Sequence, residues 1–93
     1  MLERDIVAAI MRHLKTVPDC FAWKTHGNEF CAGIPDIIAC VGGYFVAFEV
    51  KRPGGKLTKL QEVTIRRIND AKGKACMVQS VAEVKNILKT LNI

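Results

Sequence analysis

The sequence predicts a mixed α/β fold in the order αβββαβα, with a central mixed sheet flanked by helices. Residues 2–17 show the apolar spacing of an amphipathic helix, and three strand-like stretches follow between residues 20 and 51. A fourth strand pattern, at residues 74–79, lies between two segments that begin with helix-capping residues. A hairpin followed by a helical crossover to a last strand gives a mixed sheet. The 93 residues are enough for one small core, so we expect a single domain over residues 1–93.

The first helix is predicted by apolar residues at helical spacing, at positions 2, 6, 7, 10, 14 and 17. Pro18 is expected to end it. Glu3 shares the stripe of Val7 and Leu14, so we expect a carboxylate on the inward face of the helix near its start. Two explanations stay open: an acid favoured by the helix dipole in the first turn, or an interior acid that needs a cation as its partner.

The segment after Pro18 begins with the stretch "CFAWK" at residues 20–24, which predicts the first strand. The following residues, 25–33, have no periodic pattern and are expected to be irregular. His26 lies in this segment. We interpret it as a loop residue within reach of a substrate rather than as a metal ligand.

The second and third strands are predicted as a hairpin. Residues 34–41 form the second strand and end at Gly42-Gly43, a dipeptide that favours a tight hairpin turn. Residues 44–51 form the third strand, in which the side chains on both faces are apolar until Glu49. This pattern is typical of a strand covered on both faces, so we expect it near the centre of the sheet.

The element after the hairpin is a helix from Thr58 to about Ala71. Thr58 and Gln61 have the spacing of a capping box, and Gly73 is expected to end the helix. The helix follows the loop "RPGGKL", which is rich in residues that favour turns.

The last part of the chain predicts a strand and a helix. The stretch "KACMVQ" at residues 74–79 forms the fourth strand. Ser80 and Glu83 repeat the capping-box spacing, and the final helix extends to about Leu91.

The composition is that of an ordinary globular domain, with 49% hydrophobic and 25% charged residues, and excludes a disordered chain. The net charge of +5 favours an anionic partner such as nucleic acid or an acidic membrane surface, although a basic soluble protein fits equally well. No window reaches membrane-spanning length. Four cations fall within nine residues that contain no acid: Lys51, Arg52, Lys56 and Lys59.

The four cysteines have no metal-binding spacing and argue against a structural zinc site; they are Cys20, Cys31, Cys40 and Cys76. Cys40 and Cys76 lie in apolar runs, where a reduced cysteine behaves as a small hydrophobic residue. We therefore expect a reducing, intracellular compartment such as the cytoplasm.

Strand pairing across the glycine turn brings two carboxylates together. Counting back from the turn sets residue 38 against 47, and therefore Asp36 against Glu49. Adjacent carboxylates repel each other and destabilise a hairpin unless a cation binds between them. Oxygen ligands of this kind suit Mg²⁺ or Mn²⁺. Lys51, one pleat further on the same face, would then stand beside the metal site.

These residues resemble the signature of the PD-(D/E)xK nuclease superfamily. Asp36 follows Pro35, and a gap of twelve residues leads to Glu49-x-Lys51. The surrounding stretches "GIPD" and "FEVKRPGGKLTKLQ", together with the early Glu3, are similar to the virus-type replication-repair nuclease (VRR-NUC) branch. The resemblance covers nearly the whole chain and implies a restriction-endonuclease-like core.

The resemblance also implies roles for individual residues. Asp36 and Glu49 would hold Mg²⁺ or Mn²⁺ together with the backbone carbonyl of Val50, and Glu3 would add a contact to the metal or its water. Lys51 would orient or deprotonate the attacking water and stabilise charge on the phosphate. The implied reaction is metal-assisted hydrolysis of a phosphodiester, with one or two metal ions.

Gln61 matches a glutamine that, in this family, supports the lysine or the metal's water. Its capping-box role is an open alternative, because one side-chain amide would have to serve both Thr58 and the site.

DNA is the expected partner. Arg52, Lys56 and Lys59 are candidates for phosphate contacts, and a solvated charged loop is the alternative for each of them. The six aromatic residues lie mostly inside strand patterns, so few are expected to be free for stacking on bases, which favours duplex or branched DNA over single strands.

The resemblance implies a structure-selective DNA endonuclease, similar to Holliday-junction resolvases, that acts as a homodimer in DNA repair. A phage origin and a location inside the host cell fit the same family. The alternatives are a basic nucleic-acid-binding module that has the same fold but does not cut, and a purely structural subunit.

Overall fold

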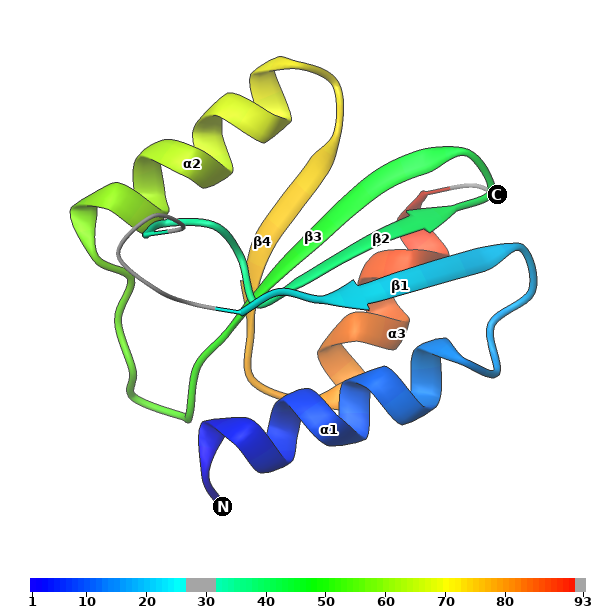
Figure 1. Ribbon diagram of the computed structural model, residues 1–93, viewed down its shortest axis with the longest axis horizontal. Helices are drawn as coiled ribbons and strands as arrows, with labels where there is room; N and C mark the ends of the chain where they lie inside the picture. The colour runs from blue at the N-terminus through cyan, green and yellow to red at the C-terminus, as the bar shows by residue number, and fades with distance from the viewer. Residues whose placement is uncertain (27–31, 92–93) are drawn as a thin grey trace.

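The computed structural model describes residues 1–26 and 32–91 of the chain (Figure 1). The order αβββαβα and the mixed sheet flanked by helices are confirmed. The elements are α1 (Glu3–Leu14), β1 (Cys20–Lys24), β2 (Ile37–Val41), β3 (Tyr44–Val50), α2 (Lys59–Asp70), β4 (Lys74–Val78) and α3 (Val81–Thr90).

The sheet has the strand order β1-β2-β3-β4, so β2 and β3 are its central strands. The first three strands pair antiparallel, whereas β3 and β4 are parallel and are connected through α2. Gly42 and Gly43 both have positive φ, as a two-residue type I′ turn requires. The register that follows from this turn, Ile38 opposite Ala47, is the predicted one.

One face of the sheet packs against α1 and α3 and forms the core, with α3 behind β1 and β2 in the view of Figure 1. The two helices meet each other along this face, and α1 also contacts β1 and β3. The inward stripe of α1 consists of Ile6, Val7, Ile10 and Leu14, all buried. From β3, Val46, Phe48 and Val50 point into the same core because alternate residues share a face.

Helix α2 lies on the opposite face and covers only the β4 side of it. Asn69 fixes its position, because the Asn69 amide accepts a hydrogen bond from the Ala75 N–H (2.8 Å) and donates one to the Ala75 carbonyl (3.0 Å). Because β4 is an edge strand, the N–H and carbonyl of Ala75 have no further strand to pair with, and these two bonds satisfy them. Gly73 allows the close approach, since a Cβ there would lie 2.9 Å from Ile68 and 3.2 Å from Phe45. No residue of α2 is buried.

Two boundaries differ by three residues from the sequence prediction. Strand β2 begins at Ile37 instead of residue 34, because Pro35 has no N–H for the ladder. Helix α1 ends at Leu14, three residues early, and the Thr16 hydroxyl donates to the His13 carbonyl (2.7 Å) after its last turn.

The capping box predicted at the start of α3 is only half formed. Ser80 accepts a hydrogen bond from the Glu83 N–H (3.2 Å), as a capping residue does. The Glu83 carboxylate instead accepts from the N–H of Gln79 (2.9 Å), one residue before the expected donor.

The Asn69 contact should account for much of the attachment of α2. Asn69→Ala removes both hydrogen bonds to Ala75, and we expect it to lower the free energy of unfolding by about 1–2 kcal/mol. Urea unfolding followed by circular dichroism measures this change. Asn86→Ala, at an exposed position of α3, is the matched control and should change stability by less than about 0.5 kcal/mol. Equal effects of the two substitutions would contradict the role of Asn69.

Candidate active site

Asp36 and Glu49 lie side by side where β2 begins and β3 ends. Their carboxyl groups are hydrogen-bonded to each other, and one oxygen of Asp36 accepts a bond from the Val50 N–H (2.8 Å). Glu49 is 3% exposed and is the single charged residue that is buried in the described part of the chain. The juxtaposition that strand pairing predicted is therefore present in the structure.

The environment of Glu49 favours its protonated form. Burial, followed by the hydrogen bond and the negative charge of Asp36, raises the pKa of Glu49 to about 8, while Lys51 opposes the shift. At neutral pH the protonated form of Glu49 is therefore favoured in the absence of a metal ion. A divalent cation would relieve the same repulsion without the proton.

The donor set fits a hard divalent cation. It offers two carboxyl groups and the backbone of Val50, whose N–H already orients Asp36. Within residues 1–26 and 32–91, no three His, Cys, Asp or Glu side chains gather as a metal cluster. Oxygen ligands from a carboxylate pair and a carbonyl suit Mg²⁺ or Mn²⁺, which keep several of their waters.

Glu3 is exposed, so the prediction that it faces inward is wrong. It is the first residue of α1, whereas the buried stripe of this helix begins at Ile6. The Glu3 carboxylate is nevertheless close enough to Glu49 for its charge to contribute to the raised pKa of that group. Glu3 therefore lies at the solvent-exposed border of the site. Because its carboxylate is not buried, it does not require a cation as a partner.

A groove with a volume of about 620 Å³ opens beside Glu3. It is lined by the start of α1, the loop after β3 and the residue after β4: Met1, Glu3, Ile6, Arg52, Pro53, Gly54, Gly55 and Gln79. Sequence reasoning did not find Gln79. The parallel pairing of Val50 with Val78 is the signal that could have done so, because it puts Gln79 next to Lys51.

Lys51 is half-buried and is held by its neighbours. Its N–H donates to the Val78 carbonyl (3.0 Å), which extends the ladder between β3 and β4. The loop then folds back through a hydrogen bond from the Gly55 N–H to the Arg52 carbonyl (2.8 Å). A Cβ at Gly55 would lie 3.1 Å from the Cβ of Lys51, so the loop packs directly on the stem of the lysine.

Gln61 forms the capping box that was its alternative role. Its side-chain oxygen accepts from the Thr58 N–H (2.9 Å), and the Thr58 hydroxyl accepts from the Gln61 N–H (3.2 Å). The amide oxygen is therefore committed to the start of α2. Only the Nε2 end of Gln61 remains for a contact with the site.

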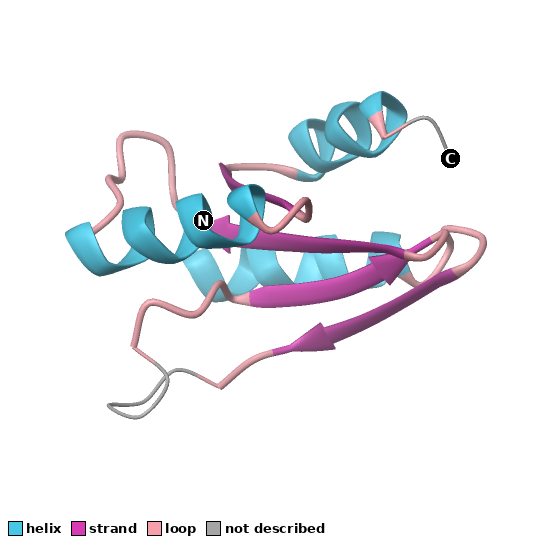
Figure 2. Ribbon diagram, turned by 90° about the horizontal axis from the view of Figure 1, so that it is seen from above, coloured by secondary structure: helices cyan, strands magenta, loops and turns pink. Residues whose placement is uncertain are grey.

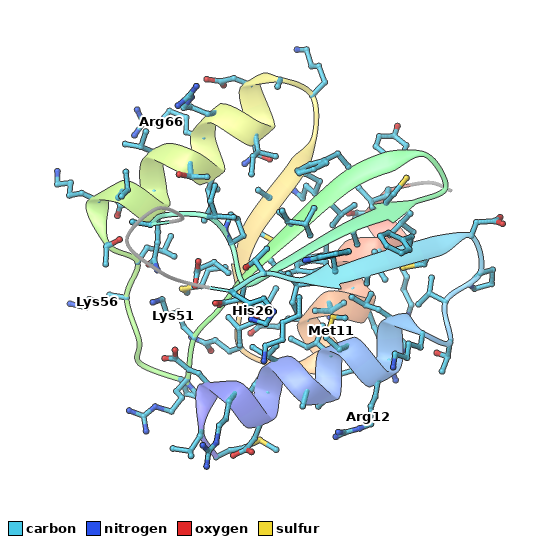
Figure 3. All side chains as sticks on the ribbon, in the orientation of Figure 1. Met11, Arg12, His26, Lys51, Lys56 and Arg66 are labelled. Atoms are coloured by element: carbon cyan, nitrogen blue, oxygen red, sulfur yellow. The ribbon has the colours of Figure 1, made fainter. Side chains whose placement is uncertain are left out.

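The predicted phosphate contacts are all exposed. Arg52 borders the groove, Lys56 lies in the loop after β3, and Lys59 is the first residue of α2. Figure 3 shows Lys51 and Lys56 on the same segment between β3 and α2, whereas Arg66 lies farther along α2. His26 is also exposed, two residues after the end of β1.

The aromatic residues are more exposed than the sequence predicted. Their exposed fractions are 65% for Phe21, 61% for Trp23, 45% for Tyr44 and 46% for Phe45, and Phe48 is buried. Phe30 lies outside the described residues. The premise that strand patterns hide these side chains is therefore wrong, because β1 is an edge strand and α2 covers only part of one face.

The predicted surroundings of Cys40 are corrected, whereas Cys76 does pack against the hydrophobic core. Cys40 is exposed and Cys76 is half-buried, and burial raises the pKa of the Cys76 thiol. Cys31 lies outside the described residues. In the ranges 1–26 and 32–91, none of the helices has the length and apolarity needed to cross a membrane.

The fold has a counterpart among solved structures. A structure described as a "VRR_NUC domain" is similar to this chain with a TM-score of 0.77, over 94% of each chain and at 18% sequence identity. No protein-family profile and no curated protein matches the sequence. The chain therefore has the VRR-NUC fold.

The raised pKa of Glu49 makes the stability of the metal-free protein depend on pH. Because the folded-state pKa is about 8 and the ordinary value is 4.5, the contribution of Glu49 to stability is fully present below pH 4.5 and is lost as the pH rises toward 8. We expect a loss on the order of a few kcal/mol across this range, measured by urea unfolding in the presence of a chelator. Glu49→Gln should remove most of this slope.

Glu62→Gln, at an exposed position of α2, is the matched control and should keep the slope of the wild type. An unchanged slope in Glu49→Gln would show that Glu49 is not the group responsible.

Gly55 should matter to the site through Lys51. Gly55→Ala places a methyl group 3.1 Å from the Lys51 Cβ and 3.0 Å from the Arg52 carbonyl, so the loop or the lysine must shift. We expect a loss of about tenfold or more in any reaction that uses Lys51. Gly43→Ala, at the β2–β3 turn with open space around it, is the control and should affect stability but not the reaction. Full activity of Gly55→Ala would contradict this role.

Proposed function

We propose that this chain is a metal-dependent endodeoxyribonuclease that hydrolyses phosphodiester bonds in branched DNA. The observation that carries the proposal is the hydrogen-bonded pair of Asp36 and Glu49, with Lys51 next on the same face. Phosphodiester hydrolysis needs a cation site and positive charge beside the reacting phosphate, and these three residues can supply both. The similarity to a structure described as a "VRR_NUC domain" supports the same interpretation.

Asp36, Glu49 and the carbonyl of Val50 would hold Mg²⁺ or Mn²⁺, with Glu3 at the border of the groove. The bound cation would neutralise charge on the phosphate and lower the pKa of a water molecule. Before any substrate arrives, the Val50 N–H keeps Asp36 in one orientation. The burial of Glu49 keeps bulk water from screening the charges of the pair.

Lys51 would orient the attacking water and stabilise the negative charge that develops on the phosphate oxygens. The packing of Gly55 on its stem restricts the positions of its ammonium group, which reduces the entropy lost when the group engages the phosphate. Gln61 would support Lys51 or the water through Nε2, the end of its amide that Thr58 does not use.

Arg52, Lys56 and Lys59 would contact the DNA backbone. All three are exposed, and they lie between the groove and the start of α2. Contacts to phosphates position a duplex without reading its sequence, so selection would act on the shape of the DNA, as in a four-way Holliday junction.

A homodimer would present two active sites to the two strands of a symmetric junction. Such an enzyme would act in DNA repair inside the cell, or inside the host cell if a phage encodes it. The net charge of +5 fits a protein that binds nucleic acid in either setting.

Cleavage of four-way junctions, flaps and linear duplexes with Mg²⁺ or Mn²⁺ tests the proposal. We expect wild-type activity to depend on the metal and to fall by about 100-fold or more in Lys51→Ala and in Asp36→Asn. Lys85→Ala, at an exposed position of α3 away from the groove, is the control and should remain active.

Two results would contradict the proposal: no cleavage of any substrate by the wild type, or equal cleavage by the wild type and both variants. Salt-sensitive DNA binding without a metal-dependent product would identify the chain as a non-cleaving nucleic-acid-binding module of the same fold.

A further inference from the structure

The sheet face that carries Glu49 also carries exposed aromatic side chains. Phe45 lies on the same face as Glu49, because side chains alternate along β3 and the two positions differ by an even number. Cys40 is opposite Phe45 and Phe21 is opposite Cys40, so one row of this face crosses β1, β2 and β3. Trp23 lies on the same face of β1 in the next row. We name Phe21, Trp23 and Phe45 the aromatic platform.

The aromatic platform is continuous with the candidate active site. Trp23 is opposite Ile38, and Asp36 lies on the same face one pleat before Ile38, so the rows of Trp23 and Asp36 are neighbours. The Thr25 N–H donates to the Asp36 carbonyl (2.9 Å), which extends the contact of β1 and β2 to the row of Asp36. Neighbouring rows lie about 6.8 Å apart along a strand, which is about two nucleotides of stacked DNA. A base on Trp23 would therefore belong to a nucleotide close to a phosphate at Asp36 and Glu49.

The rings of the platform are free to stack on other groups. Phe21 is 65% exposed and Trp23 is 61% exposed, and their ring planes are tilted by 48° at a centroid distance of 6.4 Å, so neither ring covers the face of the other. With Phe45, they leave on the order of 350 Å² of aromatic surface in water. Exposed apolar patches of this size are often functional, and sheets that stack bases on aromatic side chains are an established mode of nucleic-acid recognition. In Figure 2 no helix within the described residues lies over this side of β1 and β2.

Helix α2 borders this face with apolar side chains and a cation. A Cβ at Gly33 would lie 2.6 Å from Leu60, so the side of α2 that carries Leu60 faces the connection between β1 and β2. Val63 and Arg67 follow Leu60 at i+3 and i+7 and therefore lie on the same side of the helix. Leu60, Val63 and Arg67 are all exposed. A guanidinium group in this place can contact a phosphate or stack on a base.

The strands that carry the platform contribute positive rather than negative charge at its border. Lys24 follows Trp23 at the end of β1 and is exposed. Lys51 lies one pleat beyond Glu49 on the face of the platform. Strands β1, β2 and β3 are described completely, and Glu49, which is buried, is the one acid that they contain. Aromatic rings bordered by cations are the combination that binds single-stranded nucleic acid.

We infer that the aromatic platform binds unpaired bases of the DNA strand whose phosphate lies at the candidate active site. The inference rests on the proposed function for the position of that phosphate, and it extends the proposal by naming the substrate class. That class is branched DNA with a single-stranded segment at the branch, such as a flap. Bases in a duplex stack on each other and present only their edges in the grooves, whereas an unpaired base offers its face to Phe21 or Trp23. The platform thus selects a branch over a continuous duplex.

The fluorescence of Trp23 tests the inference directly, because Trp23 is the single tryptophan of the chain. The wild type is titrated with a short oligodeoxythymidylate in the presence of a chelator, so that no cleavage occurs. We expect saturable quenching, since a base stacks on the indole. An abasic oligomer of the same length carries the phosphates without the bases and should not quench, and neither should a linear duplex. Equal quenching by the abasic oligomer, or no quenching by the oligodeoxythymidylate, would overturn the inference.

Substitutions on the platform provide a second measurement, the anisotropy of labelled DNA. Trp23→Ala and Phe21→Ala should each weaken binding of the oligodeoxythymidylate by about tenfold relative to binding of a duplex. Trp23→Phe keeps an aromatic face and should retain most of the affinity. Circular dichroism checks that the variants remain folded. Unchanged affinity in a folded Trp23→Ala variant would contradict base stacking.

Tyr44→Ala is the matched control. Tyr44 is 45% exposed and Phe45 is 46% exposed, but the two neighbours point to opposite faces of β3. Tyr44→Ala should therefore bind the oligodeoxythymidylate like the wild type. Equal weakening by Tyr44→Ala and Trp23→Ala would overturn the assignment of the platform. A mass of two chains that falls to one in Trp23→Ala, without quenching by DNA in the wild type, would also overturn it, in favour of a protein contact.

Cleavage with Mn²⁺ distinguishes failure of this inference from failure of the proposed function. If both hold, Trp23→Ala lowers cleavage of a flap by about tenfold relative to cleavage of a linear duplex. Quenching by the oligodeoxythymidylate in a wild type that cuts no DNA would refute the nuclease and support base binding. Metal-dependent cleavage without quenching would refute base binding and leave the nuclease intact.

Discussion

The hydrogen-bonded contact between Asp36 and Glu49 is the interaction on which the site depends. Like charges at this spacing on a hairpin are unfavourable, and the raised pKa of Glu49 reduces this cost in the absence of a cation because it favours the protonated form. The Val50 N–H holds Asp36, and the sheet itself holds Glu49. The pair therefore resembles a preformed ligand set that carries an electrostatic cost until a cation replaces the proton.

The rest of the fold positions groups around this pair. The parallel contact between β3 and β4 brings Gln79 next to Lys51, and the turn at Gly55 packs the loop on the lysine stem. Helix α1 places Glu3 at the solvent border. Helix α2 is attached through Asn69 to the edge strand β4 and covers only the β4 side of its face of the sheet.

Local rules in the sequence were sufficient to predict the helices and strands and the juxtaposition of Asp36 and Glu49. Gly42-Gly43 set the register, and register brought Asp36 to Glu49 because side chains alternate along a strand. Gln61 was correctly given a capping alternative, which the structure shows. Periodicity could not show which partner covers a face. Glu3 lies on the stripe of α1 but beyond the sheet that buries the stripe, and Trp23 lies in a strand whose outer face has no covering helix.

Calorimetric titration of Mn²⁺ tests the central claim, that Asp36 and Glu49 together form a cation site, most directly. The account predicts saturable binding to the wild type, weakened by about tenfold or more in Glu49→Gln and in Asp36→Asn, with a smaller effect of Glu3→Gln at the exposed border. Equal binding by the wild type and the Glu49 and Asp36 variants, or no binding by the wild type, would contradict it.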